Sequence, residues 1–201
     1  MENSKAYKEL FEQLNATGFQ KKDGYYPRIM EEIYDWEREE VEKVIWEAYP
    51  RDIYLAQFLP KLKKYDGVKA LKEMLPECRI PSYGSVTISH VLYECTGDGK
   101  YLDVIKQNID KDEDAISYVA TLSYCKPCKK AYDLLVDIYL ESNNEISRSA
   151  AVTGILYNKG VIKDPHDLQE MSANVELGRK FDEDDKDERK KIIERFENGQ
   201  L

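Results

Sequence analysis

Residues 83–109 read YGSVTISHVLYECTGDGKYLDVIKQNI, and this stretch decides the fold class. Its apolar residues recur three and four positions apart over 83–95 and again over 100–109, which is the spacing of amphipathic helices. The segment TGDG between the two runs is typical of a turn. We therefore expect 83–109 to form two helices joined by a short turn.

The same arrangement recurs along the chain. The dipeptides Ile88-Ser89, Ile116-Ser117 and Ile146-Ser147 are separated by 28 and 30 residues, and a turn containing glycine or proline follows each of them. Almost no segment alternates between apolar and polar residues, so strands are not expected and the fold class is predicted to be all-α. The predicted helix pairs are 52–75, 83–109, 112–141 and 145–171.

A helix pair of this length cannot bury its own apolar face, so such units stack on one another. The pattern over roughly residues 51–171 resembles the HEAT-like and armadillo-like repeat families. That resemblance implies a right-handed α-α superhelix made by one domain of 201 residues, with capping helices in 1–50 and a charged capping helix in 172–201. An irregular bundle of helices is the alternative.

The segments before and after the predicted repeats differ in how clearly their helices can be predicted. Residues 28–48 carry an apolar stripe that Glu37 interrupts, so this segment is either one long helix or two helices with a break near Asp35. The acidic run 182–188 fits the solvated start of a capping helix, where carboxylates suit the helix dipole.

Composition limits the classes of partner. The net charge of −9 and the isoelectric point of about 5.0 argue against a nucleic-acid binder and against an anionic membrane surface, and they permit a basic partner. The first residues, MENSK, lack the apolar region of a signal peptide, and no apolar run is long enough to cross a bilayer. We therefore expect a cytoplasmic protein.

The sequence suggests no catalytic or metal site. Cys125 and Cys128 share the Cys-x-x-Cys form of thiol–disulfide enzymes, but a helix precedes them where those enzymes have a strand. Zinc needs a second pair of ligands, and His90 with Cys95 lies one repeat earlier. The other histidine, His166, is expected at a helix start. We predict no enzyme, no metal and no cofactor.

Tyrosine is the residue type that stands out as a candidate for binding. The predicted helix 129–141 carries a second stripe made of Tyr132, Val136 and Tyr139, and the predicted helix 100–109 carries a similar one that includes Tyr101. A helix that is apolar on two faces is either sandwiched in a core or exposed to a partner. Acidic residues such as Asp98 lie beside these rings and suit a basic protein surface. The predicted partner-binding residues are Tyr101, Asp103, Tyr132, Asp133, Val136, Asp137 and Tyr139.

A small, acidic chain without enzyme motifs is similar to the immunity proteins of bacterial polymorphic toxin systems, which cover the active site of a cognate toxin. This resemblance implies a protein-binding scaffold that neutralises a basic toxin. A regulatory or assembly subunit with helical repeats is the alternative. A HEAT-like DNA glycosylase is a third reading, but it predicts a strongly basic concave face, and the only net-positive stretch is 51–75.

Overall fold

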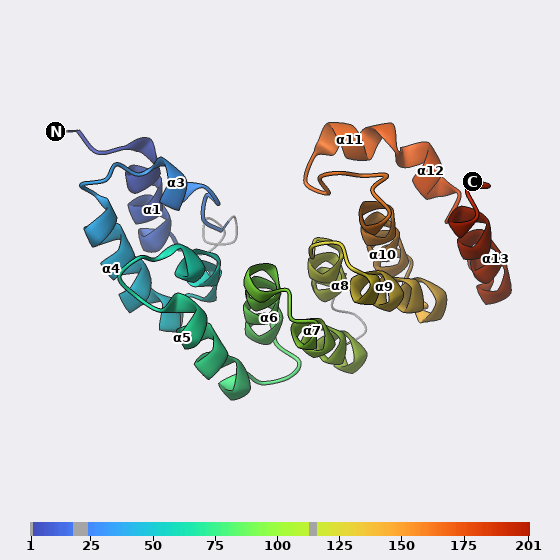
Figure 1. Cartoon of the computed structure of the whole chain (residues 1–201), viewed down its shortest axis with the longest axis horizontal. Helices are drawn as coiled ribbons and strands as arrows, with labels where there is room; N and C mark the ends of the chain where they lie inside the picture. Colours follow the sequence, from blue (N-terminus) through green and yellow to red (C-terminus); the bar gives the residue numbers. More distant parts are fainter. Residues whose placement is uncertain (1, 18–23, 113–115) are drawn as a thin grey trace. The chain divides into compact units, whose positions relative to one another are not determined.

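The computed structural model describes residues 2–17, 24–112 and 116–201, and in these ranges it contains helices and no strand (Figure 1). The prediction of an all-α chain is confirmed at this level. The chain divides into two compact units, Met1–Cys78 and Arg79–Leu201, which are described separately. No helix in the described ranges combines the length and the apolar composition that a membrane span requires.

The first unit consists of short helices, some of them of the 3-10 type. Ser4 caps its first helix by accepting a hydrogen bond from the Tyr7 backbone N–H. The core contains Leu10, Ile45 and Phe58, all of them fully buried. The elements are α1 (Lys5–Asn15), α3 (Ile29–Glu32), α4 (Arg38–Ala48), η1 (Tyr49–Arg51), η2 (Ile53–Lys61), α5 (Gly67–Met74) and η3 (Leu75–Glu77).

The ambiguity in 28–48 is resolved as two helices, and Glu37 lies at the break. Its carboxylate is fully buried and accepts hydrogen bonds of 2.7 Å and 2.6 Å from the backbone N–H and the hydroxyl of Ser4. A third bond of 2.8 Å comes from the Tyr34 backbone N–H. Burial by itself would raise the pKa of Glu37, but these hydrogen bonds together outweigh it and the pKa is lowered. The buried residue is therefore an ionised acceptor for three donors.

The first predicted helix pair, 52–75, needs a correction. Residues Ile53–Lys61 form the 3-10 helix η2 and not an α-helix. Pro60 inside this segment has no backbone N–H to donate, and Leu62 donates to the carbonyl three residues back, that of Leu59. The Leu59 carbonyl also lies against Gly67, where an added Cβ would be only 2.0 Å from its oxygen. Glycine therefore permits this close approach of η2 and α5.

The second unit contains two adjacent rows of helices (Figure 1). In the first row α6 contacts α8, and α8 contacts α10. In the second row α7 contacts α9, and α9 contacts α13. This arrangement agrees with stacked helix pairs within the unit. The helices are α6 (Tyr83–Thr96), α7 (Lys100–Lys111), α8 (Ile116–Ser123), α9 (Lys129–Glu141), α10 (Glu145–Asn158), α11 (Leu168–Ala173), α12 (Val175–Arg179) and α13 (Lys186–Glu197).

The predicted pair 145–171 is wrong in its second member. A helix was expected to start at Asp164-Pro165, but α11 begins at Leu168 after the cap Asp167, and it packs on α12. The helix that packs on α9 in the second row is α13. The acidic run before α13 has its expected role, because Asp185 caps the helix by accepting from the N–H groups of Asp187 and Glu188.

Candidate functional site

The structure places two of the three predicted tyrosine anchors in the core. Tyr101 on α7 is 4% exposed, and Tyr139 on α9 is 0% exposed. The Tyr139 hydroxyl donates a 2.8 Å hydrogen bond to the Phe181 carbonyl, and the two rings meet edge to face. Burial raises the pKa of Tyr139 to about 12. These contacts correct the placement of Tyr101 and Tyr139 on an exposed stripe, and they agree with the alternative core interpretation.

The third predicted anchor, Tyr132, is half-buried on α9. Its hydroxyl donates a 2.9 Å hydrogen bond to Oε1 of Glu197 at the end of α13. The Lys159 ammonium lies 4.3 Å from the centre of its ring, within the range of a cation–π contact. Val136, one turn further along α9, is also half-buried. Tyr132 therefore connects α9 to α13 and keeps part of its ring accessible.

The predicted acidic residues are exposed, and most of them are paired within the second unit. Asp98, Asp103 and Asp133 each form an ion pair with a lysine, at 2.8, 2.6 and 2.6 Å. Asp137 is also exposed, and it has no ion pair among the described residues. Asp137 is therefore the predicted site residue whose charge is most available to a partner.

Asp137 borders a depression of about 180 Å³ at the carboxyl-terminal ends of α7 and α9. Apolar side chains of α7, α8 and α9 contribute to its lining, and polar groups come from the start of the connection to α10. Sequence reasoning had singled out Asp137 alone of these residues. The depression is lined by Lys106, Ile109, Asp110, Val119, Asp137, Ile138, Glu141, Ser142, Asn143 and Ser147.

The charges around this depression are mainly negative. Among the described residues, three carboxylates line it, those of Asp110, Asp137 and Glu141, and Lys106 is the one cationic residue. Lys106 is paired with Asp110, and Glu141 is paired with Lys186 of α13, whose hydrogen bond holds the pKa of Glu141 below its usual value. The carboxyl-terminal ends of two helices add partial negative charge. The depression is therefore suited to a cation.

A second depression, of about 290 Å³, lies between α10 and the short helices α11 and α12. Its lining is more apolar and includes Val152, Met171 and Val175. The cationic residues in this lining are already neutralised, because Arg148 pairs with Asp184 at 2.5 Å and Arg179 pairs with Glu176 at 2.6 Å. The described residues of this lining mix apolar groups, neutralised basic groups and the carboxylates of Glu145 and Asp182, and this mixture does not indicate one chemical class of ligand.

A third group of polar side chains lies where α6 meets the turn after α8. His90 and Glu94 come from α6, and Cys125 comes from the turn. Burial lowers the pKa of His90, although Glu94 partly opposes this effect. Burial also raises the pKa of the Cys125 thiol, which is fully inaccessible. The sequence had drawn attention to His90 and Cys125 but not to Glu94, whose spacing of four residues from His90 places both on one helix face.

The four thiols should differ in their rate of alkylation. Cys95 is exposed, Cys78 and Cys128 are half-buried, and Cys125 is fully buried. Because the thiolate is the reacting form, iodoacetamide should modify Cys95 first and Cys125 last. Peptide mass spectrometry over a time course measures this order, and the denatured protein provides the control in which the rates should converge. Modification of Cys125 as fast as Cys95 would contradict the burial described here.

No protein-family model matches this chain, and no curated protein or solved structure matches it significantly. The resemblances to helical-repeat proteins and to immunity proteins are therefore not tested by these comparisons and stay predictions.

Proposed function

We propose that this protein binds another protein and that the acidic depression at the ends of α7 and α9 receives a lysine or arginine side chain of that partner. The observation that supports this most directly is Asp137, an exposed carboxylate without an ion pair in the described chain, at the rim of a depression lined by two further carboxylates. The sequence had proposed Asp137 for the same role.

The composition of the depression suits a long basic side chain. The aliphatic part of a lysine or arginine can lie on apolar groups such as Ile109 and Ile138, while its charged end meets carboxylates at the rim. Arginine adds a planar fork of donors that matches two carboxylate oxygens. A small acidic molecule is disfavoured by the same charges. The proposed ligand is therefore a basic segment of a protein.

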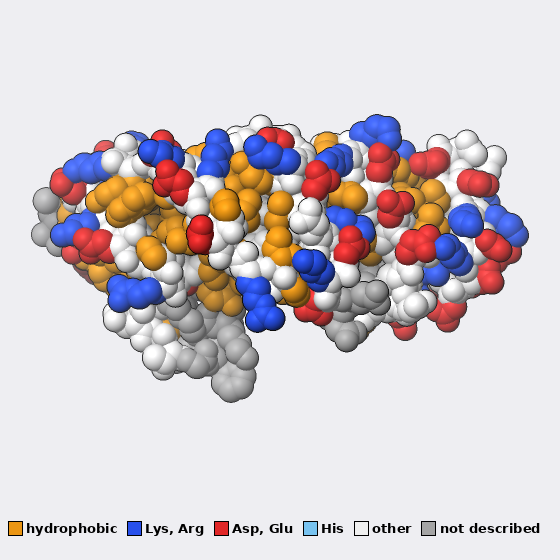
Figure 2. All heavy atoms as spheres, turned by 90° about the horizontal axis from the view of Figure 1, so that it is seen from below, with side chains coloured by type: hydrophobic (Ala, Val, Ile, Leu, Met, Phe, Trp, Pro, Cys, Tyr) orange, Lys and Arg blue, Asp and Glu red, His pale blue; other side chains and the backbone are white. Residues whose placement is uncertain are grey.

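The wider form of the proposal is a scaffold of stacked helix pairs in a right-handed superhelix. Such scaffolds present one helix of each pair on a continuous surface, and α7 and α9 are adjacent second helices. An immunity protein that covers a basic toxin is one member of this class, and a regulatory or assembly subunit is another. On the face drawn in Figure 2, acidic side chains lie between the basic ones, which is unlike the basic surface of a DNA glycosylase.

The proposal is tested with a hexa-arginine peptide and the isotopically labelled protein. Nuclear magnetic resonance titration at low salt should shift the amide signals of 109–110 and 137–143 in preference to the rest of the chain. Asp137→Lys should weaken the binding about 3- to 10-fold, which corresponds to roughly 0.7–1.4 kcal/mol, because one attraction is replaced by a repulsion. Added salt should reduce the affinity.

The matched control is Glu194→Lys, which changes the net charge equally at an exposed position of α13. It should weaken the binding less than Asp137→Lys does, because Glu194 does not line the depression. Equal weakening by both variants, or shifts spread evenly over the chain, would show that the peptide responds only to net charge. A hexa-glutamate peptide should not bind.

A further inference from the structure

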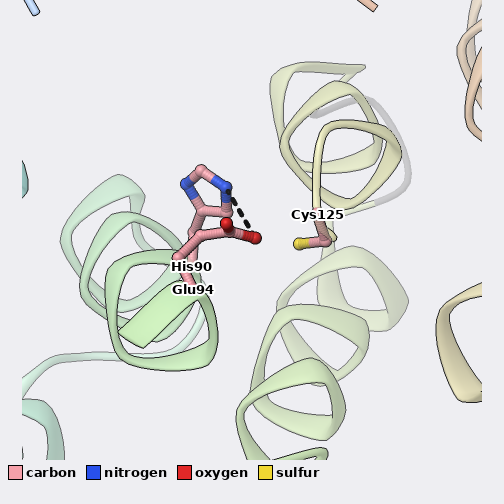
Figure 3. A group of neighbouring side chains, drawn as sticks. All are labelled: His90, Glu94 and Cys125. Carbon is pink, nitrogen blue, oxygen red and sulfur yellow. Dashed lines mark ion pairs between the residues drawn. The ribbon is translucent and has the colours of Figure 1, made fainter. Parts of the chain in front are cut away.

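The side chains of His90, Glu94 and Cys125 point toward one another (Figure 3). Their ligand atoms, one nitrogen, one carboxylate oxygen and one sulfur, all lie within 4.8 Å of one another. His90 Nε2 is 3.9 Å from Glu94 Oε1, which is an ion-pair distance but too long for a hydrogen bond. Three different polar atoms therefore lie close together, and no hydrogen bond joins His90 to Glu94.

We propose that His90, Glu94 and Cys125 bind one zinc ion and thereby connect α6 to the turn that follows α8. Imidazole nitrogen, thiolate sulfur and carboxylate oxygen are the three donor types that zinc takes in proteins. A thiolate ligand disfavours magnesium and calcium, which take oxygen donors. Three protein ligands leave one position of a tetrahedral ion for water. The site lies within the second unit and is separate from the acidic depression.

The three ligand atoms need only small movements to bind one zinc ion. Zinc bonds of about 2.0–2.3 Å at tetrahedral angles hold ligand atoms about 3.3–3.6 Å apart. The present separations of up to 4.8 Å therefore shorten by at most about 1.2–1.5 Å, which rotation of the His90 and Glu94 side chains can supply. These two side chains are 30% and 27% exposed, so an ion can enter from solvent, whereas Cys125 forms the buried end of the site.

The backbone around the site is held in place without the ion. The Lys126 backbone N–H donates a 2.8 Å hydrogen bond to Glu94 Oε1, and the Tyr93 hydroxyl donates a 2.9 Å bond to the Lys126 carbonyl. Carboxylates that bind metals are commonly hydrogen-bonded in this way by a second layer of groups. These two hydrogen bonds therefore hold α6 and the turn after α8 next to each other before an ion binds.

Binding exchanges one ion for one proton. The Cys125 thiol donates a weak 3.5 Å hydrogen bond to the Thr121 carbonyl. When zinc binds, the sulfur–zinc bond forms, the sulfur–hydrogen bond breaks heterolytically, and the proton goes to the buffer. The Lys126 ammonium, 3.5 Å from Glu94 Oε2, opposes the incoming cation, and the negative charges of the thiolate and the carboxylate offset it.

Cobalt(II) is the probe for this site, because thiolate coordination produces a charge-transfer absorption in the near ultraviolet. Tag-free, fully reduced protein should bind one equivalent of cobalt(II) with this absorption, and one equivalent of zinc(II) should remove it. Cys125→Ser should abolish the absorption, whereas Cys95→Ser and Cys128→Ser should retain it. The Cys128 variant is the closest control, since this thiol lies only three residues away.

His90→Gln keeps the test decisive if the Cys125 variant folds poorly, because His90 is partly exposed. It should weaken cobalt(II) binding by at least about tenfold and leave the circular dichroism spectrum unchanged. The proposal is overturned if the unaltered protein shows no thiolate absorption with stoichiometric cobalt(II). It is also overturned if the absorption disappears with Cys128→Ser and persists with Cys125→Ser.

Discussion

Replacing Tyr139 by alanine is expected to lower the free energy of unfolding by about 3–5 kcal/mol, the usual cost of removing a fully buried aromatic ring. The variant loses the edge-to-face contact with Phe181 and leaves the Phe181 carbonyl without its hydroxyl donor. Arg189 of α13 is buried and donates a 2.9 Å hydrogen bond to the Tyr139 carbonyl, so α13 should loosen together with α9. Urea denaturation followed by far-ultraviolet circular dichroism measures the effect.

Tyr139→Phe is the matched control, because it keeps the ring and removes only the hydroxyl. Its cost should be about 1 kcal/mol. Tyr132→Ala should have a smaller effect than Tyr139→Ala, since that ring is only half-buried. A Tyr139→Ala protein as stable as the unaltered chain would show that the ring lies outside the core, and the interface interpretation of the stripe would apply again.

Replacing Gly67 by alanine should destabilise the first unit by an amount near the upper end of about 1–3 kcal/mol. The new Cβ would lie 2.0 Å from the Leu59 oxygen and 2.4 Å from the Leu59 carbonyl carbon, and these backbone atoms cannot rotate away as a flexible side chain could. Both tryptophans of the chain, Trp36 and Trp46, lie in this unit, so tryptophan fluorescence during urea denaturation reports on it directly.

Gly178→Ala provides the same chemical change at a site where no neighbouring atom lies within 4 Å of the new Cβ. This glycine is inside α12, so alanine should be neutral or should stabilise by up to about 1 kcal/mol. An equally mild result for Gly67→Ala would mean that η2 and α5 separate at little cost, and the close approach described above would then not limit the stability of the unit.

Helical periodicity was sufficient to locate most helices. The predicted range 129–141 coincides with α9, and 83–95 and 145–157 lie within one residue of α6 and α10. The apolar spacing in η2 correctly indicated a helix. That spacing does not distinguish a 3-10 helix from an α-helix, and here Pro60 and the close approach of Gly67 to Leu59 determine the backbone conformation. Sequence spacing therefore determined the presence of that helix better than its type.

The register of the repeats was harder to predict. It was inferred from three Ile-Ser dipeptides, and a dipeptide does not show how its helix packs. Ile88 is fully buried, whereas Ile146 is 61% exposed, so the Ile-Ser dipeptides do not occupy equivalent positions in their helices. The second member of the last pair was misplaced for a similar reason. The short helix α11 follows α10 directly, but α13 provides the surface that packs on α9.

The candidate site was predictable in part. The two apolar stripes on α9 left two alternatives open, a helix packed on both sides in the core or a helix with one face exposed to a partner. Tyr139 is packed in the core. Phe181, Ile192 and Ile193 are buried with it, although their segment is mostly charged and was expected to form a capping helix. Asp137 was predicted because it lies beside the tyrosine stripe, and Glu141 follows it by four residues on the same helix. Asp110 joins them only through the packing of α7 beside α9.

The carboxylate at the break between α3 and α4 selects one of two backbone conformations that the rest of this segment permits. The apolar stripe of 28–48 is compatible with one continuous helix, and a leucine at position 37 would complete that stripe. Glu37 instead requires donors, and the N–H groups of Ser4 and Tyr34 with the Ser4 hydroxyl provide them only when the chain turns at this point. The single residue that violates the hydrophobic pattern thus favours the observed turn over the competing straight helix.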